Sequence, residues 1–403
     1  MPQDMISARQ FLPERQLKRL VREYPTPFFL YDERTLREQA AMIRQCFCWA
    51  QSFLPYFPVR MNPNPAILSL LAECGMGALC ATASELQLAV DCGFPGRSLL
   101  FAPNRQDAQA DRLCSQLEAI RLIDGVQDLP MEPPARVMLN FHPENLSGRE
   151  KRLSQLVRQN RFGMTQQEFQ EMAERFTAFP PEYLAVCLLT GRNETEGDCW
   201  LQGAQRLFQK AIALQEQCGR RIDGICLGEG PGVAYRTNFP QPDFPAYADG
   251  VRQLAKTLLE PAGLASAELS LLPGRLTAAS AGAYFTSVVS VKPGEENPIA
   301  LVDGSTAQFP RTSGLGNYHY ISAPFREQEK KCDLYDVVGC LGDRTDCFGD
   351  RRLLPILRTG DLLLVHEAGT DGSSLYAGYG GWERAKEYLL TLSGRVREIT
   401  PEP

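Results

Sequence analysis

Short runs of apolar and β-branched residues alternate along the chain with segments in which apolar residues recur every three or four positions. The first pattern is typical of buried strands and the second of amphipathic helices. Eight strands are predicted in this way, at residues 55–59, 77–82, 98–102, 119–124, 135–141, 184–190, 224–228 and 268–272.

The predicted helices lie between these strands. Residues 65–74 place Ile67, Leu70 and Leu71 on one helix face, and residues 200–218 have an apolar face of the same period. Parallel strands need crossover helices, so eight strand and helix units in succession predict a (β/α)8 barrel. Three of the helices are followed by glycines suited to C-caps, which are Gly75, Gly93 and Gly219.

The pattern changes after Gly274. The segments SVVSVKP (287–293), PIALVDGS (298–305), YDVVGCLG (335–342) and DLLLVHEAG (361–369) are apolar runs separated by glycine, proline and aspartate. Such runs are typical of short strands joined by turns. The sequence therefore predicts an α/β chain, with the barrel joined to a second, all-β domain.

Composition narrows the class of protein. The chain has 403 residues, of which 44% are hydrophobic and 22% charged, as expected of a globular protein with more than one domain. A net charge of −6 without a basic block argues against nucleic acid and anionic membranes as partners. No apolar run reaches membrane-spanning length and the N-terminus lacks a secretory signal, so a soluble cytoplasmic protein is expected.

Cysteine and histidine do not form metal-binding patterns. The thirteen cysteines include no CxxC pair, and the histidines are only His142, His319 and His366. Reduced thiols, no disulfide and no metal site are expected.

Three segments together resemble a known family. YPTPFFLYD (24–32), PVRMNPNPAILSLLAECG (58–75) and SELQLAVDCGFP (84–95) are similar to the pyridoxal-phosphate amino-acid decarboxylases of fold type III, the diaminopimelate, ornithine and arginine decarboxylase group, and most of all to diaminopimelate decarboxylase. The resemblance covers nearly the whole chain. It implies a barrel at residues 30–275, a β domain made of residues 1–29 and 276–403, and a homodimer.

Position 60 departs from the family. In the family, the strand ends at this position in a lysine that forms a Schiff base with the cofactor. This chain has Arg60 instead, and a guanidinium stays protonated at neutral pH. No other lysine ends a predicted barrel strand. We expect Arg60 to be buried at the barrel mouth and paired with a phosphate, a ligand carboxylate or Glu85; a purely structural salt bridge is the alternative.

Other positions keep the family's anion contacts. Gly228, Gly230 and Gly232 match its glycine-rich phosphate loop, although a tight strand-to-helix turn explains the same glycines. Arg275 matches the arginine of an EPGR segment. The resemblance further implies that Arg311 binds the substrate carboxylate and that Tyr379 contacts the cofactor phosphate; a structural ion pair and a packed aromatic are the respective alternatives.

Several residues that transfer protons or contact the cofactor ring in the family are replaced by other residues in this chain. Leu189 stands where an imidazole stacks on the cofactor, and Gly342 where a cysteine reaches across the dimer interface. Asp343 and Asp346 follow at acidic family positions and are candidate acid or base groups, against the alternative of turn-forming aspartates. Four further residues belong to this set: Asp371 and Leu315 replace family tyrosines, and Cys340 or Cys347 offers a thiol if the loop is shifted.

Three functions follow from these changes. The first is a noncatalytic homologue, a pseudoenzyme that binds an anionic metabolite or amino acid, or a partner subunit such as an active paralogue in a mixed dimer. The second is an amino-acid decarboxylase, a carbon–carbon lyase, that holds pyridoxal 5'-phosphate noncovalently. The third is a barrel enzyme of another class that acts on a phosphorylated or dicarboxylic substrate.

Overall fold

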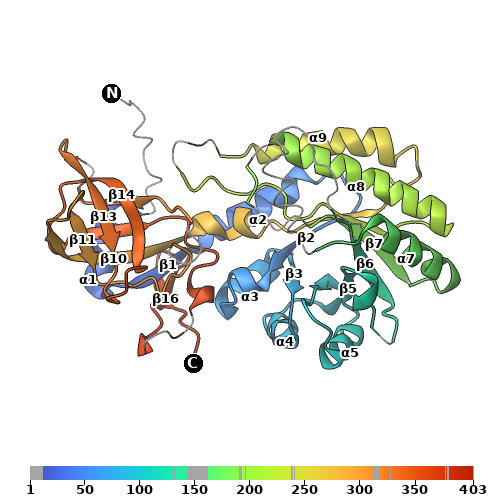
Figure 1. Ribbon diagram of the computed structural model, residues 1–403, viewed down its shortest axis with the longest axis horizontal. Coiled ribbons are helices and arrows are strands. Elements are labelled where there is room, and N and C mark those ends of the chain that lie inside the picture. Colours follow the sequence, from blue (N-terminus) through green and yellow to red (C-terminus); the bar gives the residue numbers. More distant parts are fainter. Residues whose placement is uncertain are drawn as a thin grey trace. The chain divides into compact units, whose positions relative to one another are not determined.

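The computed structural model describes residues 12–130, 132–142, 162–189, 193–195, 197–236, 239, 241–312, 317–326, 328–376, 378 and 381–402. These residues form two compact units (Figure 1). One unit, the barrel unit, contains those of 37–233 and 241–277. The other, the sheet unit, contains those of 1–36, 234–240 and 278–403.

The described strands of the barrel unit close into a ring of eight, and each strand pairs in parallel with its neighbours. This confirms the predicted barrel. The strands are β2 (Phe53–Pro58), β3 (Gly77–Cys80), β4 (Leu99–Phe101), β5 (Ile120–Ile123), β6 (Arg136–Asn140), β7 (Tyr183–Cys187), β8 (Gly224–Cys226) and β9 (Glu268–Leu271).

Helices follow the strands around the barrel (Figure 1). Ile67, Leu70 and Leu71 are buried, as the predicted apolar face requires. The three C-cap glycines have positive φ, which confirms their place after the helices. The helices are α2 (Glu33–Cys46), α3 (Pro65–Glu73), α4 (Ala83–Asp91), α5 (Ala108–Gln116), α7 (Gln166–Ala178), α8 (Gly197–Cys218), α9 (Phe244–Leu254), the π-helical turn η4 (Ala255–Leu259) and α10 (Gly274–Ala278).

Two apolar cores hold the barrel unit together. One fills the barrel interior with side chains such as Leu100, Leu122 and Cys226. The other lies between the strands and the helices, where Phe208 and Ile225 are fully buried. Parallel strands that are buried on both faces read as continuous apolar runs, which is why they were predictable.

The sheet unit carries the described strands of the all-β part. They form a nine-stranded sheet in which β1, near the start of the chain, pairs in parallel with β16, near its end (Figure 1). This confirms the second, mostly β domain. The elements are α1 (Glu14–Glu23), β1 (Phe28–Asp32), β10 (Gly282–Lys292), β11 (Ile299–Val302), β12 (Ile321–Ser322), β13 (Cys332–Val338), β14 (Cys347–Pro355), β15 (Leu362–Val365), β16 (Lys386–Leu390) and β17 (Val396–Glu398).

Two general features concern the helices and the cysteines. None of the helices in the described residues is long and apolar enough to cross a membrane. All thirteen cysteines are free thiols, and Cys48 and Cys332 are the exposed ones.

Candidate functional site

Arg60 follows β2 at the carboxyl end of the barrel, the end at which barrel enzymes place their chemistry. Residues 59–61 form a single 3-10 turn in which Val59 and Met61 are buried and Arg60 is exposed. The expectation of a buried Arg60 is therefore wrong. The strand ends one residue earlier than predicted, and the turn rotates the middle side chain toward solvent.

Glu85 is an acid whose pKa the charge of Arg60 affects. Its carboxylate accepts a hydrogen bond of 2.6 Å from the Ala81 backbone N–H, just before α4. Partial burial raises the pKa of Glu85, while the Ala81 N–H and the charge of Arg60 lower it. Within the part of the chain that the structure describes, Arg60 makes no hydrogen bond or ion pair, so the two residues interact only at longer range.

Arg275 lies on the segment next to Arg60. Strands β2 and β9 are paired, and Arg275 is half-buried on α10, which begins just after β9. A Cβ on Gly274 would lie 2.3 Å from the Met61 sulfur, so the two segments are in direct contact. Two arginines of the predicted anion site thus follow neighbouring strands at one edge of the barrel mouth.

The glycine-rich loop after β8 is closed by bonds within the protein. Gly228 and Gly230 have φ of +73° and +60°, and a Cβ on Gly228 would lie 2.1 Å from the Leu188 carbonyl oxygen. The Gly232 N–H donates to the Glu194 carbonyl at 2.8 Å. Packing inside the protein thus already requires glycine in this turn, as the alternative interpretation held.

Two polar residues that the sequence analysis missed tie the loops at the mouth together. Asn140, fully buried at the end of β6, donates from Nδ2 to Asp124 Oδ1 at 2.6 Å. Its Oδ1 accepts from the Leu189 backbone N–H at 2.9 Å. The signal in the sequence was a polar residue at or next to the end of a predicted strand: Asp124 is the last residue of 119–124, and Asn140 is the last but one of 135–141. Leu189 itself is half-buried.

Arg311 is part of a buried network in the sheet unit. Only 4% of the residue is exposed. Its Nη1 donates to Asp371 Oδ2 at 2.9 Å, its Nε donates to His319 Nε2 at 3.1 Å, and its guanidinium carbon lies 4.8 Å from the centre of the Tyr235 ring. The alternative of a structural ion pair is therefore what the structure shows for Arg311.

His319 completes this network as a neutral ring. Because Nε2 accepts from Arg311, the proton is on Nδ1, which donates to the His366 carbonyl at 2.8 Å. Burial lowers the pKa of His319 to about 3, and the charge of Arg311 acts in the same direction. Burial also lowers the pKa of His366 to about 4.

Comparison with known proteins identifies the family. The family model described as pyridoxal-dependent decarboxylase, C-terminal sheet domain, matches residues 28–369. The chain belongs to the pyridoxal-dependent decarboxylases. Protein TabA of Pseudomonas amygdali pv. tabaci is 28% identical over 401 residues, which are 99% of this chain and 93% of that protein.

Two further relatives carry the name diaminopimelate decarboxylase. The protein from Bacteroides thetaiotaomicron is 26% identical over 382 residues, 91% of this chain and 96% of its own. The crystal structure of the M. jannaschii protein in co-complex with L-lysine has a TM-score of 0.86 at 22% identity, over 95% of this chain and 91% of that one. The shared fold is that of a diaminopimelate decarboxylase.

The family implies pyridoxal phosphate, and the described residues of the barrel unit include no lysine at a strand end to which it could attach as a Schiff base. That link needs an amine at the barrel mouth. In the described part of the barrel unit, the lysines are Lys210 on α8 and Lys256 in η4, neither of which ends a strand. Lys151 lies outside the described residues.

Asp346 and Asp343, the candidate acid or base groups of this chain, accept hydrogen bonds from loop residues. Asp346 is 2% exposed and accepts from the backbone N–H groups of Thr306 and Leu341, each at 2.7 Å. Asp343 is exposed and accepts from the Thr345 N–H at 2.7 Å, which is a local turn bond. The Asp343 contact supports the turn-forming alternative, whereas Asp346 joins its own loop to Thr306, forty residues away. Among the described residues, no three His, Cys, Asp or Glu side chains gather as metal ligands would.

The thiols near Gly342, which stands at the position of the family's interface cysteine, do not have the lowered pKa of a reactive thiolate. Cys340 donates to the Asp303 carbonyl at 3.1 Å, and burial raises the pKa of both Cys340 and Cys347. Gly342 has φ of +75° in an open turn. Tyr379 and Leu315 lie outside the described residues.

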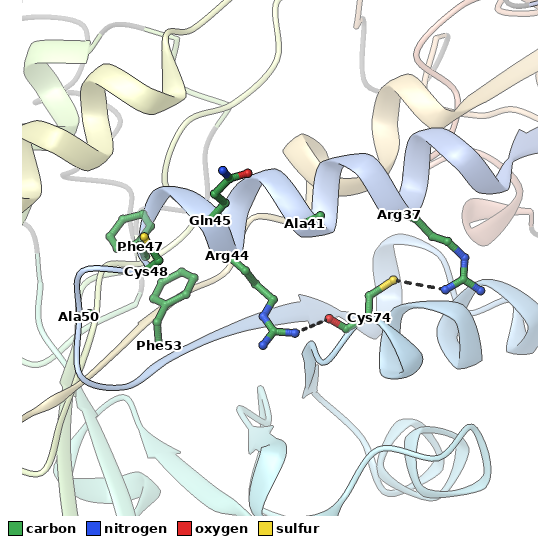
Figure 2. Close-up of a pocket in the computed structure, with 9 residues that line it drawn as sticks. All are labelled: Arg37, Ala41, Arg44, Gln45, Phe47, Cys48, Ala50, Phe53 and Cys74. Atoms are coloured by element: carbon green, nitrogen blue, oxygen red, sulfur yellow. Dashed lines mark hydrogen bonds between the residues drawn. The ribbon is translucent and has the colours of Figure 1, made fainter.

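A groove of about 650 Å³ runs along α2 in the barrel unit (Figure 2). Phe53, the first residue of β2, lines it, so the groove lies at the amino end of that strand rather than at the end that carries Arg60. Arg44 donates to the Cys74 carbonyl at 2.8 Å and Arg37 reaches the Cys74 sulfur at 3.9 Å (Figure 2). These arginines tie α2 to the end of α3.

Proposed function

We propose that this decarboxylase homologue has lost lysine-dependent pyridoxal phosphate chemistry and binds an anionic metabolite at its barrel mouth. The observation that carries the proposal is the exposed Arg60 after β2, where the family resemblance places the Schiff-base lysine. A guanidinium stays protonated in proteins and does not act as the amine nucleophile. The same group is well suited to bind a carboxylate or phosphate with two hydrogen bonds.

The charges at this edge of the barrel mouth favour an amino acid as the ligand. Arg60 and Arg275 follow the paired strands β2 and β9, and Glu85 contributes an acid beside Arg60. An amino acid has a carboxylate for the arginines and an amine for the acid. The M. jannaschii relative was crystallised with L-lysine, so an amino acid of this kind is the first ligand to test.

The test is a calorimetric titration with L-lysine. Wild-type protein should bind, Arg60→Gln should bind at least about tenfold more weakly because a charged contact is lost, and Arg112→Gln on the exposed face of α5 should match wild type. Equal affinity in wild type and Arg60→Gln would place the ligand elsewhere. Analytical ultracentrifugation with an active paralogue would then test the alternative of a partner subunit.

Turnover is measured on the same proteins. With pyridoxal phosphate and diaminopimelate or L-lysine present, wild-type protein should release no more CO2 than a protein-free control. Release of CO2 by wild type above that control, abolished by Arg60→Gln, would overturn the proposal. It would favour a decarboxylase that holds its cofactor noncovalently.

A further inference from the structure

A pair of arginines stacks on one tyrosine in the sheet unit, next to the network of Arg311 and His319. The guanidinium carbon of Arg352, on β14, lies 3.8 Å from the centre of the Tyr318 ring, and that of Arg236 lies 4.3 Å from it. Two like charges are thus held close together on one aromatic side chain.

The charges in this cluster are not matched by acids. In the described part of the chain, neither Arg236 nor Arg352 has a carboxylate within ion-pair distance. The Arg352 Nε is buried against Gly349 and has no hydrogen-bond partner there. Burial lowers the pKa of Arg352, Arg236 lowers it further, and Tyr318 and Asp350 oppose both effects.

The neighbouring ion pair of Arg311 and Asp371 does not supply a negative charge for this cluster. Arg311 is paired with Asp371, so that pair is close to neutral. The charge of Arg352 also acts on His319, which is neutral itself. The cluster therefore has two cations, a tyrosine hydroxyl and partial access to solvent, since Arg236 is exposed and Tyr318 half-exposed.

We propose that Arg236, Tyr318 and Arg352 form a binding site for a phosphate-type oxyanion. A doubly charged oxyanion would neutralise both guanidinium groups, and their planar N–H forks match its oxygens. Stacking on the tyrosine orients the two forks before the anion arrives. This site shares no residue with the barrel mouth and does not rest on the proposed function.

The alternative is that the arginines stack on Tyr318 only to pack residues 235 and 236 onto the sheet. A titration with inorganic phosphate, followed by calorimetry at constant ionic strength, separates the two. It is carried out in the wild-type chain and in Arg60→Gln, so that binding at the barrel mouth is distinguished from binding at this cluster.

We expect phosphate to bind in both backgrounds and to bind at least about tenfold more weakly after Arg236→Gln or Arg352→Gln. Arg358→Gln, an exposed arginine of the same unit, should leave the affinity unchanged. Arg236 is exposed, so its variant keeps the test valid if Arg352→Gln fails to fold. Absence of phosphate binding, or affinity unchanged by Arg236→Gln, would overturn the proposal.

Discussion

At the scale of single residues, Arg311 and Arg60 show opposite departures from what the sequence suggested. Arg311, expected to receive a substrate carboxylate, is engaged by the carboxylate of Asp371 inside the protein. Arg60, expected to be buried and paired, is exposed. Neither outcome could be predicted from neighbouring residues in the sequence. Arg311 and its partner Asp371 are sixty residues apart, and the single 3-10 turn at residues 59–61 decides where Arg60 points.

The pair of Arg311 with Asp371 gives the first prediction. Asp371→Asn leaves a buried guanidinium without a counter-charge, so the free energy of unfolding should fall by about 3 kcal/mol. Urea unfolding followed by circular dichroism measures this. Glu118→Gln, which breaks the exposed pair with Arg97, is the control and should leave the urea midpoint unchanged. Equal effects of the two changes would show that the buried pair is not stabilising.

His319 gives a prediction about pH. Its pKa is lowered in the folded state, so the unfolded chain takes up a proton first as the pH falls. Its contribution is complete above the unfolded pKa of about 6.5 and is lost progressively as the pH falls toward about 3. Between pH 7 and pH 5 this amounts to about 2 kcal/mol for one histidine.

Urea unfolding at several pH values, with wild type and His319→Gln side by side, checks the pH prediction. Glutamine keeps both a donor and an acceptor but cannot take up the proton. Stability should therefore depend less on pH in the variant. Parallel pH curves for the two proteins would contradict the assignment.

At the scale of elements, the barrel strands could be predicted from sequence because apolar runs mark strands that are buried on both faces. Their ends could not. Residues 184–190 were predicted as one strand, yet β7 ends at Cys187 and Leu188 and Leu189 continue into the loop. The glycines after β8 were equally ambiguous, since a phosphate contact and a close backbone approach require the same residue.

The close approach at Gly228 can be tested on its own. Gly228→Ala should destabilise the protein by about 1 to 3 kcal/mol more than Gly263→Ala, because both positions have φ of +73° but only the first Cβ meets a backbone atom, at 2.1 Å. Thermal or urea unfolding of the two variants measures the difference. The same loss in both would mean that only the backbone angle matters.

At the scale of the whole molecule, family membership covers the barrel and most of the sheet unit, whereas the quaternary state is an expectation from the resemblance. We expect a homodimer, so multi-angle light scattering should give twice the 44.9 kDa of one chain. A monomer at micromolar concentration would contradict this and would weaken any proposal that depends on a subunit interface.

The central claim is that Arg60 has removed the covalent chemistry of the family from a scaffold that keeps its barrel. It is tested most directly by incubating the protein with pyridoxal phosphate, reducing with borohydride and weighing the intact chain. Wild type should gain no specific adduct, and Arg60→Lys should gain one, beyond the surface labelling seen in Arg112→Lys. A single adduct on wild type, mapped to a lysine of the barrel, would contradict the claim.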